Sequence, residues 1–215
     1  CHKVTSDKEI AEKESREVFV PKNPEQFSYD EDGNLLSDDT FTYTWNGENR
    51  LTRMETTGNA ELQFGIEFSY DYKGRRIEKK VYENGVLTKH ELFIYDGFKC
   101  IEKLDALNGN NVLQNFIWYG EKILSLSTGS DTYYYLHDAN KNVSELIDAS
   151  GNIAGHYEYS PFGRITASTG TIPSDFDFRF SSEYYDPETQ LVYYNYRYYS
   201  PEPFNQIHRP QNLHF

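Results

Sequence analysis

The chain has 215 residues, a net charge of −13 at pH 7 and 16% aromatic residues, including 19 tyrosines and 14 phenylalanines. A surface this acidic repels phosphate groups, which argues against binding to nucleic acid or anionic lipid. No apolar run approaches the roughly 18 residues needed to cross a bilayer, so no membrane span is expected. Aromatic residues suit a pleated, half-buried surface, and the composition therefore predicts a thin sheet-based core whose tyrosine hydroxyls reach water.

Residues 1–24 are highly charged and have no apolar stripe, which predicts a helical or disordered lead-in ending near Pro21 and Pro24. Cys1 has two interpretations. The chain is cut here, or Cys1 is a lipid-bearing cysteine left by signal-peptide cleavage, with the lead-in as its tether. The other cysteine, Cys100, has apolar neighbours and is expected to be a buried strand thiol.

From Phe27 onward, short aromatic and aliphatic runs alternate with turn pairs. Between Gly74 and Gly120 the glycines are 11, 12, 12 and 11 residues apart. This spacing leaves room for strands of about four to six residues, and Asn-Gly or Asp-Gly favours two-residue hairpin turns with positive φ. The best example is the pair 76–82 and 86–95 around Asn84-Gly85. The pattern predicts a chain of antiparallel hairpins over residues 27–199.

One short word recurs within these hairpins, a Tyr-Asp pair followed by glycine. We expect the tyrosine ring to pack at the end of a strand and the aspartate to accept backbone N–H groups that start the turn. Glycine then takes the positive φ that other residues resist. The residues of the word in the first half of the chain are Tyr29, Asp30, Gly33 and Asn34, then Tyr70, Asp71 and Gly74, then Tyr95, Asp96 and Gly97.

Related words follow in the second half of the chain in a fixed order. They are carried by Asp138 and Asn142, by Gly151, by Tyr157, Tyr159, Pro161, Phe162, Gly163 and Arg164, by Phe178-Arg179-Phe180, by Tyr185 and Asp186, and by Arg197, Tyr198 and Tyr199. A lone Tyr-Asp pair carries no information, but this ordered series over about residues 27–203 resembles the YD repeats and the RHS repeat-associated core of RHS-family proteins.

The resemblance implies an all-β array of antiparallel hairpins in a strip or shell fragment. YD-repeat hairpins are expected over 25–130, the RHS repeat-associated core over 131–203 and a divergent tail over 204–215. In the family, the shell encloses a C-terminal toxin or other cargo, and the core plugs the shell and frees the cargo by aspartyl-type self-cleavage. The expected partners are the rest of a longer shell and its cargo, and the expected location is secreted or on a bacterial cell surface.

The chain departs from the family where the cleavage chemistry is expected. Self-cleavage of this type needs two carboxylates that share a proton. The expected Gly-Arg-aromatic word is replaced by Phe204-Asn205-Gln206, and no aspartate follows Asp186, which we interpret as a turn residue. We therefore expect a structural fragment and not an enzyme, with a remnant of an autoproteolytic core as the alternative.

Three expected glycines are also missing, at Lys141, Gln190 and Phe204. A side chain at positive φ costs on the order of 1 kcal/mol or more, unless the turn has changed type. A degraded gene copy and a different family of turns both fit this pattern.

Two binding functions compete with these structural interpretations. The acidic stretch from Asp30 to Asn34 lacks the glutamate of an EF-hand, because Phe41 stands at that position, and the histidines lack metal-site spacing. No metal or cofactor is predicted. Exposed aromatic rings on a sheet suit stacking on cell-surface glycans or contact with a protein, with packing between hairpins as the alternative; the candidates are Trp45, Trp118, Tyr133 and Tyr135.

Overall fold

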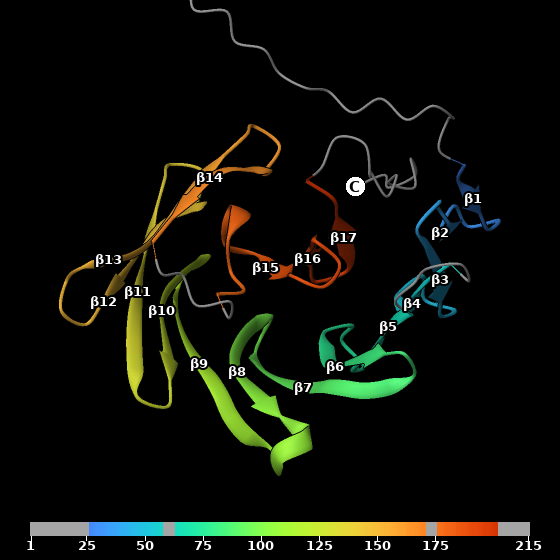
Figure 1. Ribbon diagram of the computed structural model, residues 1–215, viewed down its shortest axis with the longest axis horizontal. Coiled ribbons are helices and arrows are strands. Elements are labelled where there is room, and N and C mark those ends of the chain that lie inside the picture. The colour runs from blue at the N-terminus through green and yellow to red at the C-terminus, as the bar shows by residue number, and fades with distance from the viewer. Residues whose placement is uncertain (1–25, 58–62, 171–175, 202–215) are drawn as a thin grey trace, which may run out of the picture.

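The computed structural model describes residues 26–57, 63–170 and 176–201 (Figure 1). Fourteen strands form one antiparallel sheet in which every strand pairs with the next along the chain, and a second sheet has three strands. The predicted all-β hairpin array is confirmed.

The large sheet runs without a break past residue 130, where a domain boundary is predicted. Its strands are β1 (Ser28–Tyr29), β2 (Leu35–Ser37), β3 (Phe41–Trp45), β4 (Leu51–Thr56), β5 (Phe64–Tyr70), β6 (Arg76–Glu83), β7 (Val86–Asp96), β8 (Lys99–Asp105), β9 (Asn111–Tyr119), β10 (Lys122–Thr128), β11 (Asp131–His137), β12 (Val143–Asp148), β13 (Ile153–Tyr159) and β14 (Ile165–Thr169). The small sheet contains β15 (Tyr184–Asp186), β16 (Leu191–Tyr194) and β17 (Arg197–Tyr199).

The regularly spaced glycines lie in the turns that their spacing predicts. All five, from Gly74 to Gly120, have positive φ. Asn84 and Gly85 have φ values of 50° and 78° and join β6 to β7, which confirms the predicted hairpin. Because both central residues of this turn are left-handed, its twist matches that of the flanking strands.

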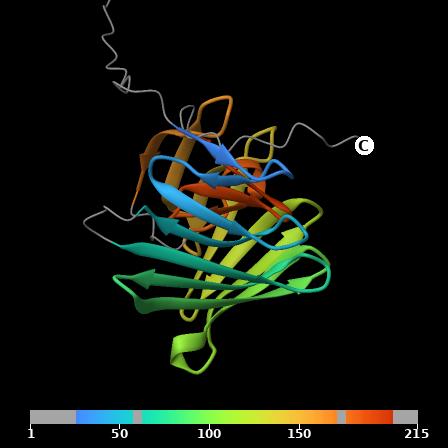
Figure 2. The same ribbon diagram turned by 90° about the vertical axis from the view of Figure 1, so that its right-hand side faces the viewer.

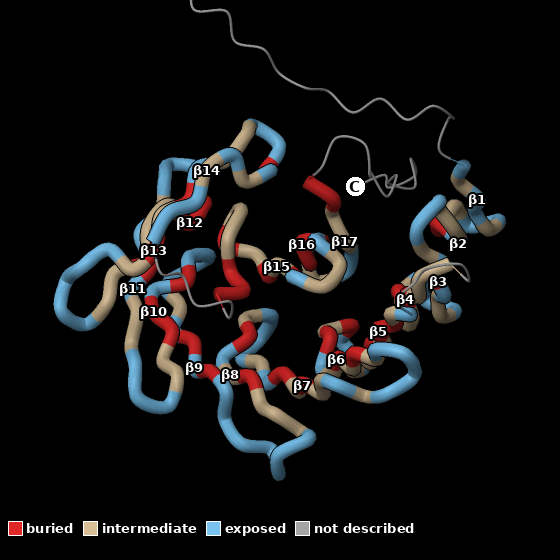
Figure 3. Tube along the Cα trace, in the orientation of Figure 1, coloured by how far each residue is buried: buried red, intermediate tan, exposed pale blue. Residues whose placement is uncertain are grey.

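The large sheet curls around the C-terminal part of the chain, so that β15–β17 lie inside its arc (Figure 1). Seen from the side, these three strands lie behind the first strands of the sheet (Figure 2). We call residues 26–170 the strip and residues 176–201 the plug. The plug covers the concave face of the strip, and the buried residues gather along this junction (Figure 3).

Two hydrophobic clusters fill the space between strip and plug. The larger one joins strip residues such as Phe93 and Phe116 to Phe176, Phe178 and Tyr184 of the plug. The smaller one gathers residues of the first strands around Leu191 of the plug. The core is therefore an interface between two sheets and depends on the plug as much as on the strip.

Aromatic side chains near the ends of strands are anchored to backbone carbonyls of a preceding strand. The expectation that tyrosine hydroxyls reach water is wrong at Tyr70, Tyr95 and Tyr159, because the neighbouring strand satisfies the donor. The pairs, at 2.7–2.9 Å, are Trp45 Nε1 to Leu35 O, Tyr70 Oη to Leu51 O, Tyr95 Oη to Arg76 O, Trp118 Nε1 to Cys100 O and Tyr159 Oη to Val143 O. These aromatic residues thus tie a strand to the one before it in the sheet.

The helices of the described ranges are two short 3-10 turns, η1 (Ala106–Asn108) and η2 (Phe180–Ser182). Neither is long and apolar enough to cross a membrane. The predicted lead-in over 1–24, with the lipid anchor at Cys1, and the tail over 204–215, with Phe204, lie outside the described residues.

Candidate functional site

The junction between strip and plug contains a buried group of charged side chains, which we call the charge cluster. Asp186 of the plug is 0% exposed and accepts hydrogen bonds from Arg76 Nη1 at 2.5 Å and from Lys79 Nζ at 2.9 Å. Both cations come from β6. A register shift near Tyr70 interrupts the alternation of this strand, so that Arg76 and Lys79 both lie on the concave face. A carboxylate of the plug is thereby held by two cations of the strip.

The cluster continues onto β7 and β8. Lys103 of β8 pairs with Asp177 of the plug and lies 3.5 Å from Glu91 of β7. Glu91 is also 3.2 Å from Lys79, so that it links the two halves of the cluster. At the edge, Glu188 of the plug accepts hydrogen bonds from the Nζ atoms of Lys79 at 2.9 Å and Lys89 at 2.6 Å.

The charges of the two parts are complementary. The plug contributes three carboxylates, whereas the strip contributes four cations and one carboxylate, so the cluster as a whole is neutral. Burial opposes ionisation of Glu188, but Lys79 and Lys89 outweigh it and lower its pKa to about 2. Burial raises the pKa of Asp177, and Lys103 opposes the rise.

Aromatic rings complete the surroundings of Arg76. Its guanidinium carbon lies 4.5 Å from the ring centre of Tyr193, 4.8 Å from that of Tyr184 and 5.1 Å from that of Phe93. A guanidinium is more weakly hydrated than an ammonium and stacks on aromatic faces, which reduces the cost of burying it.

Asp186 does start a turn, as predicted, because its carbonyl accepts the N–H of Gln190 at 2.8 Å. Sequence reasoning missed the role of its side chain in the cluster, along with Arg76, Lys79, Glu91 and Lys103 of the strip and Asp177 of the plug. The available signal was the run Arg76-Ile77-Glu78-Lys79, in which apolar and polar residues do not alternate regularly. Such an irregularity can turn two cations of a strand toward the same buried face. The sequence carried no sign that the plug supplies their partners.

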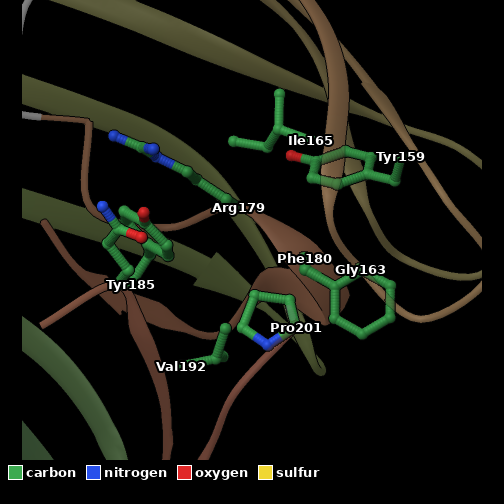
Figure 4. A pocket seen from close by; sticks show the side chains of 9 residues that line it. Tyr159, Gly163, Ile165, Arg179, Phe180, Tyr185, Val192 and Pro201 are labelled. Atoms are coloured by element: carbon green, nitrogen blue, oxygen red, sulfur yellow. The ribbon is translucent and has the colours of Figure 1, made fainter. Parts of the chain in front are cut away.

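Two of the recurring words meet at a small cavity of about 80 Å³ beside the turn between β13 and β14. Figure 4 shows Phe180 of the plug next to Gly163, with Arg179 and Tyr185 on the other side of the cavity. A Cβ atom on Gly163 would lie 2.6 Å from the Phe180 ring, and the φ of Gly163 is +85°. The glycine of this word is therefore required both by the turn and by the docking of the plug.

Six turns of the strip share one construction. The first residue, an aspartate, asparagine or serine, accepts backbone N–H groups through its side chain, as Asp71 does from Lys73 and Arg75. The fourth residue has positive φ and donates its N–H to the first carbonyl. The fourth residues are Gly33, Asn49, Gly74, Lys141, Gly151 and Gly163. Lys141 and, in the plug, Gln190 thus keep the left-handed conformation of the expected glycine, with φ values of 67° and 59°.

Replacing Lys141 by glycine is expected to stabilise the protein by about 0.5–1 kcal/mol, because glycine removes the left-handed strain at a modest entropic cost. Urea denaturation measures the change. The matched control is Lys73→Gly, which makes the same replacement in a turn at a position outside the positive-φ set and is expected to destabilise slightly. Equal effects of the two replacements would contradict the strain at Lys141.

Glu183 of the plug is half-buried, and burial together with Glu121 raises its pKa to about 7 against the opposing effects of Lys99 and Lys141. Between pH 4.5 and 7 the folded chain keeps this proton while the unfolded chain loses it, so this group destabilises the fold as pH rises. The stability of Glu183→Gln relative to the original chain is therefore expected to grow by roughly 2 kcal/mol over this range. Urea titrations at several pH values measure it, and a constant difference would contradict the shift.

The residues of the words occupy turns and strand ends. Some of them lie in turns. They are Asp30, Gly33 and Asn34 after β1, Asp71 and Gly74 after β5, Gly97 after β7, Asp138 and Asn142 after β11, Gly151 after β12, and Pro161, Phe162, Gly163 and Arg164 after β13. Those within strands of the strip are Tyr29, Tyr70, Tyr95, Asp96, Tyr157 and Tyr159, and those within the plug are Tyr185, Asp186, Arg197, Tyr198 and Tyr199. The plug brings together words that lie far apart in the sequence, since Tyr70 and Tyr198 have their hydroxyls 3.2 Å apart.

The four aromatic residues considered for sugar stacking lie in the same junction or at strand ends. Tyr135 is 4% exposed and packs edge-on against Phe176, as Tyr133 also does. Trp118 packs edge-on against Phe178 at 5.0 Å, and the indole N–H of Trp45 is bound to a carbonyl. These contacts favour the packing interpretation, and sugar stacking stays a prediction.

Within the described ranges, His, Cys, Asp and Glu side chains form no group of three or more that is arranged to hold a metal ion. Cys100 is buried and free, and its burial raises its pKa to about 12, as expected of a strand thiol without nucleophilic character.

Comparisons with known proteins agree with this architecture. A family model described as Teneurin YD-shell matches residues 13–203. The tRNA3(Ser)-specific nuclease WapA of Bacillus spizizenii is 34% identical over 182 residues, which cover 83% of this chain and 8% of that protein. Double-stranded DNA deaminase toxin A of Burkholderia cenocepacia is 22% identical over 212 residues, covering 82% of this chain and 14% of that protein.

The crystal structure of TcdB2-TccC3 has a TM-score of 0.59 and 19% sequence identity, covering 80% of this chain and 9% of that chain. This likeness shows the fold. The chain thus spans less than a sixth of each of these relatives. Because the family model covers most of the residues and the hairpin strip with its ordered words has the matching architecture, the chain belongs to the Teneurin YD-shell family and is an RHS-type YD-repeat protein.

Proposed function

We propose that the chain acts as a scaffold, a segment of shell wall together with the plug that covers its inner face. The observation that carries this proposal is the charge cluster, in which three plug carboxylates meet four strip cations. A neutral buried cluster of this kind specifies where the plug docks, because any other docking position would leave buried charges of the strip and the plug unpaired. The plug is in this way an integral part of the wall.

The wall is extended in a longer protein by further strands. The outermost strands of the strip, β1 and β14, each pair on one side only within the described residues. Such edges accept another strand, and an isolated strip tends to associate through them. In the longer, secreted protein the wall encloses a C-terminal toxin, and the plug closes the wall next to this cargo.

Protease protection of the cargo tests this function in the longer protein. The domain downstream of the plug is expected to resist protease while the wall is intact. Phe178→Ala, which removes a ring from the junction, is expected to expose that domain, whereas Phe162→Ala, at an exposed turn, is not. Equal cleavage rates in the original protein and in both variants would contradict the proposal.

We further propose that this segment has no catalytic activity of its own. The nuclease and deaminase names belong to whole proteins of which the chain matches 8% and 14%. The Asp186 side chain is engaged by two cations of the strip, Arg76 and Lys79, which gives it a structural role in the junction. Incubation of the purified chain at several pH values, and with tRNA and double-stranded DNA, is expected to give no products. A defined fragment that Asp186→Asn abolishes would contradict this.

A further inference from the structure

A second cavity lies between the turn that follows β7, strand β9 and the plug. Its volume is about 400 Å³, within the range of small-ligand pockets. Trp118 of the strip and Phe178, Tyr184 and Tyr193 of the plug contribute aromatic walls. None of the buried ion pairs of the charge cluster lines this cavity, so it is distinct from the cluster.

The charged groups of this cavity are mainly acidic. Asp96, Glu121 and Glu183 line it together with a single cation, Lys99. The pKa of Glu183, raised to about 7, indicates that its charge is poorly compensated, since burial and Glu121 outweigh Lys99 and Lys141. An aromatic pocket with an excess of carboxylates suits an organic cation.

The chain itself places one cation in this cavity. The Lys99 ammonium lies 5.0 Å from the centre of the Trp118 ring and 3.3 Å from Glu121 Oε1. Its side chain is partly exposed and thus free to move aside. The Trp118 ring therefore accepts a positive charge, whereas Glu183 forms no ion pair within the described ranges.

We propose that this cavity binds the guanidinium group of an arginine-like ligand. A guanidinium stacks on aromatic rings and presents paired N–H donors that match a carboxylate, so it can lie on the aromatic walls and neutralise Glu183. The molecule uses the same chemistry in its core, where Arg76 lies among aromatic rings, and at Tyr185, whose ring centre is 4.3 Å from Arg179. This inference goes beyond the scaffold function and does not rest on it.

The test is a titration of the full chain with N-acetyl-arginine amide, followed by the indole N–H signal of Trp118 in an NMR spectrum. The signal is assigned with Trp45→Phe. The citrulline analogue is the control, because it has the same shape without the charge. Agmatine, a free guanidinium compound, distinguishes a small-molecule ligand from an arginine in a protein, according to which probe binds more tightly.

The arginine probe is expected to give a saturable shift and the citrulline analogue none. Glu183→Gln is expected to weaken binding roughly tenfold near pH 8, and Lys99→Met to strengthen it about threefold by clearing the Trp118 face. Since Glu183 is protonated below pH 7, binding by the original chain is expected to weaken on acidification. Absence of a saturable shift, equal binding of citrulline, or an unchanged affinity in Glu183→Gln would overturn the proposal.

Discussion

Replacing Asp186 by alanine is expected to lower the free energy of unfolding by about 3–5 kcal/mol, because breaking a buried ion pair leaves its partner charge uncompensated. Arg76 and Lys79 are both buried, and each loses a direct partner in this variant. Glu91 and Glu188 remain near Lys79, but among the described residues the Arg76 guanidinium keeps only aromatic rings and the hydroxyl of Tyr198. The loss is therefore concentrated at the guanidinium.

Urea denaturation followed by tyrosine fluorescence measures this change. Asp32→Ala, at an exposed turn position, is the control and is expected to stay within about 0.5 kcal/mol of the original chain. The loss is a large part of the stability of a typical domain, so Asp186→Asn, which keeps the shape and an acceptor oxygen, serves as the milder variant. If both Asp186 variants were as stable as the control, Asp186 would have no structural role in the cluster.

The strip could be predicted from the sequence because its information is local. Each turn carries its own residues, an acceptor side chain and a residue that tolerates positive φ, and a run between two turns has room for only one strand. The hairpin of β6 and β7 was therefore predicted almost to the residue. Even Lys141 conforms, because the side chain of Asp138 fixes the turn and forces a left-handed φ on the residue that stands there.

The junction could not be predicted because its partners lie far apart in the chain. Asp186 meets Arg76 across 110 residues, and Lys103 meets Asp177 across 74. Charge alone does not identify such pairs, since inward cations on a strand are unusual and exposed ones are common. Binding of tyrosine hydroxyls to carbonyls was missed for a related reason, because burial of the concave face depends on where the plug lies.

Replacing Phe178 by alanine is expected to cost about 3–5 kcal/mol, the usual range for deleting a buried aromatic ring. Phe178 is buried and packs edge-on against Phe116 at 4.9 Å, Trp118 at 5.0 Å and Tyr184 at 5.6 Å. The first two rings belong to the strip, so the deletion acts at the junction. Phe162→Ala, whose ring is 72% exposed, is the control and is expected to have little effect on urea denaturation.

A double-mutant cycle with Phe116→Ala shows where this energy resides. If the Phe178 ring stabilises the protein by packing on the strip, the two deletions are expected to be non-additive by about 1 kcal/mol or more, as for residues in direct contact. Additive losses would mean that Phe178 acts within the plug alone. Coupling between Phe116 and Phe178, together with the loss in Asp186→Ala, would establish that both ring packing and charge pairing across the junction hold the plug on the strip.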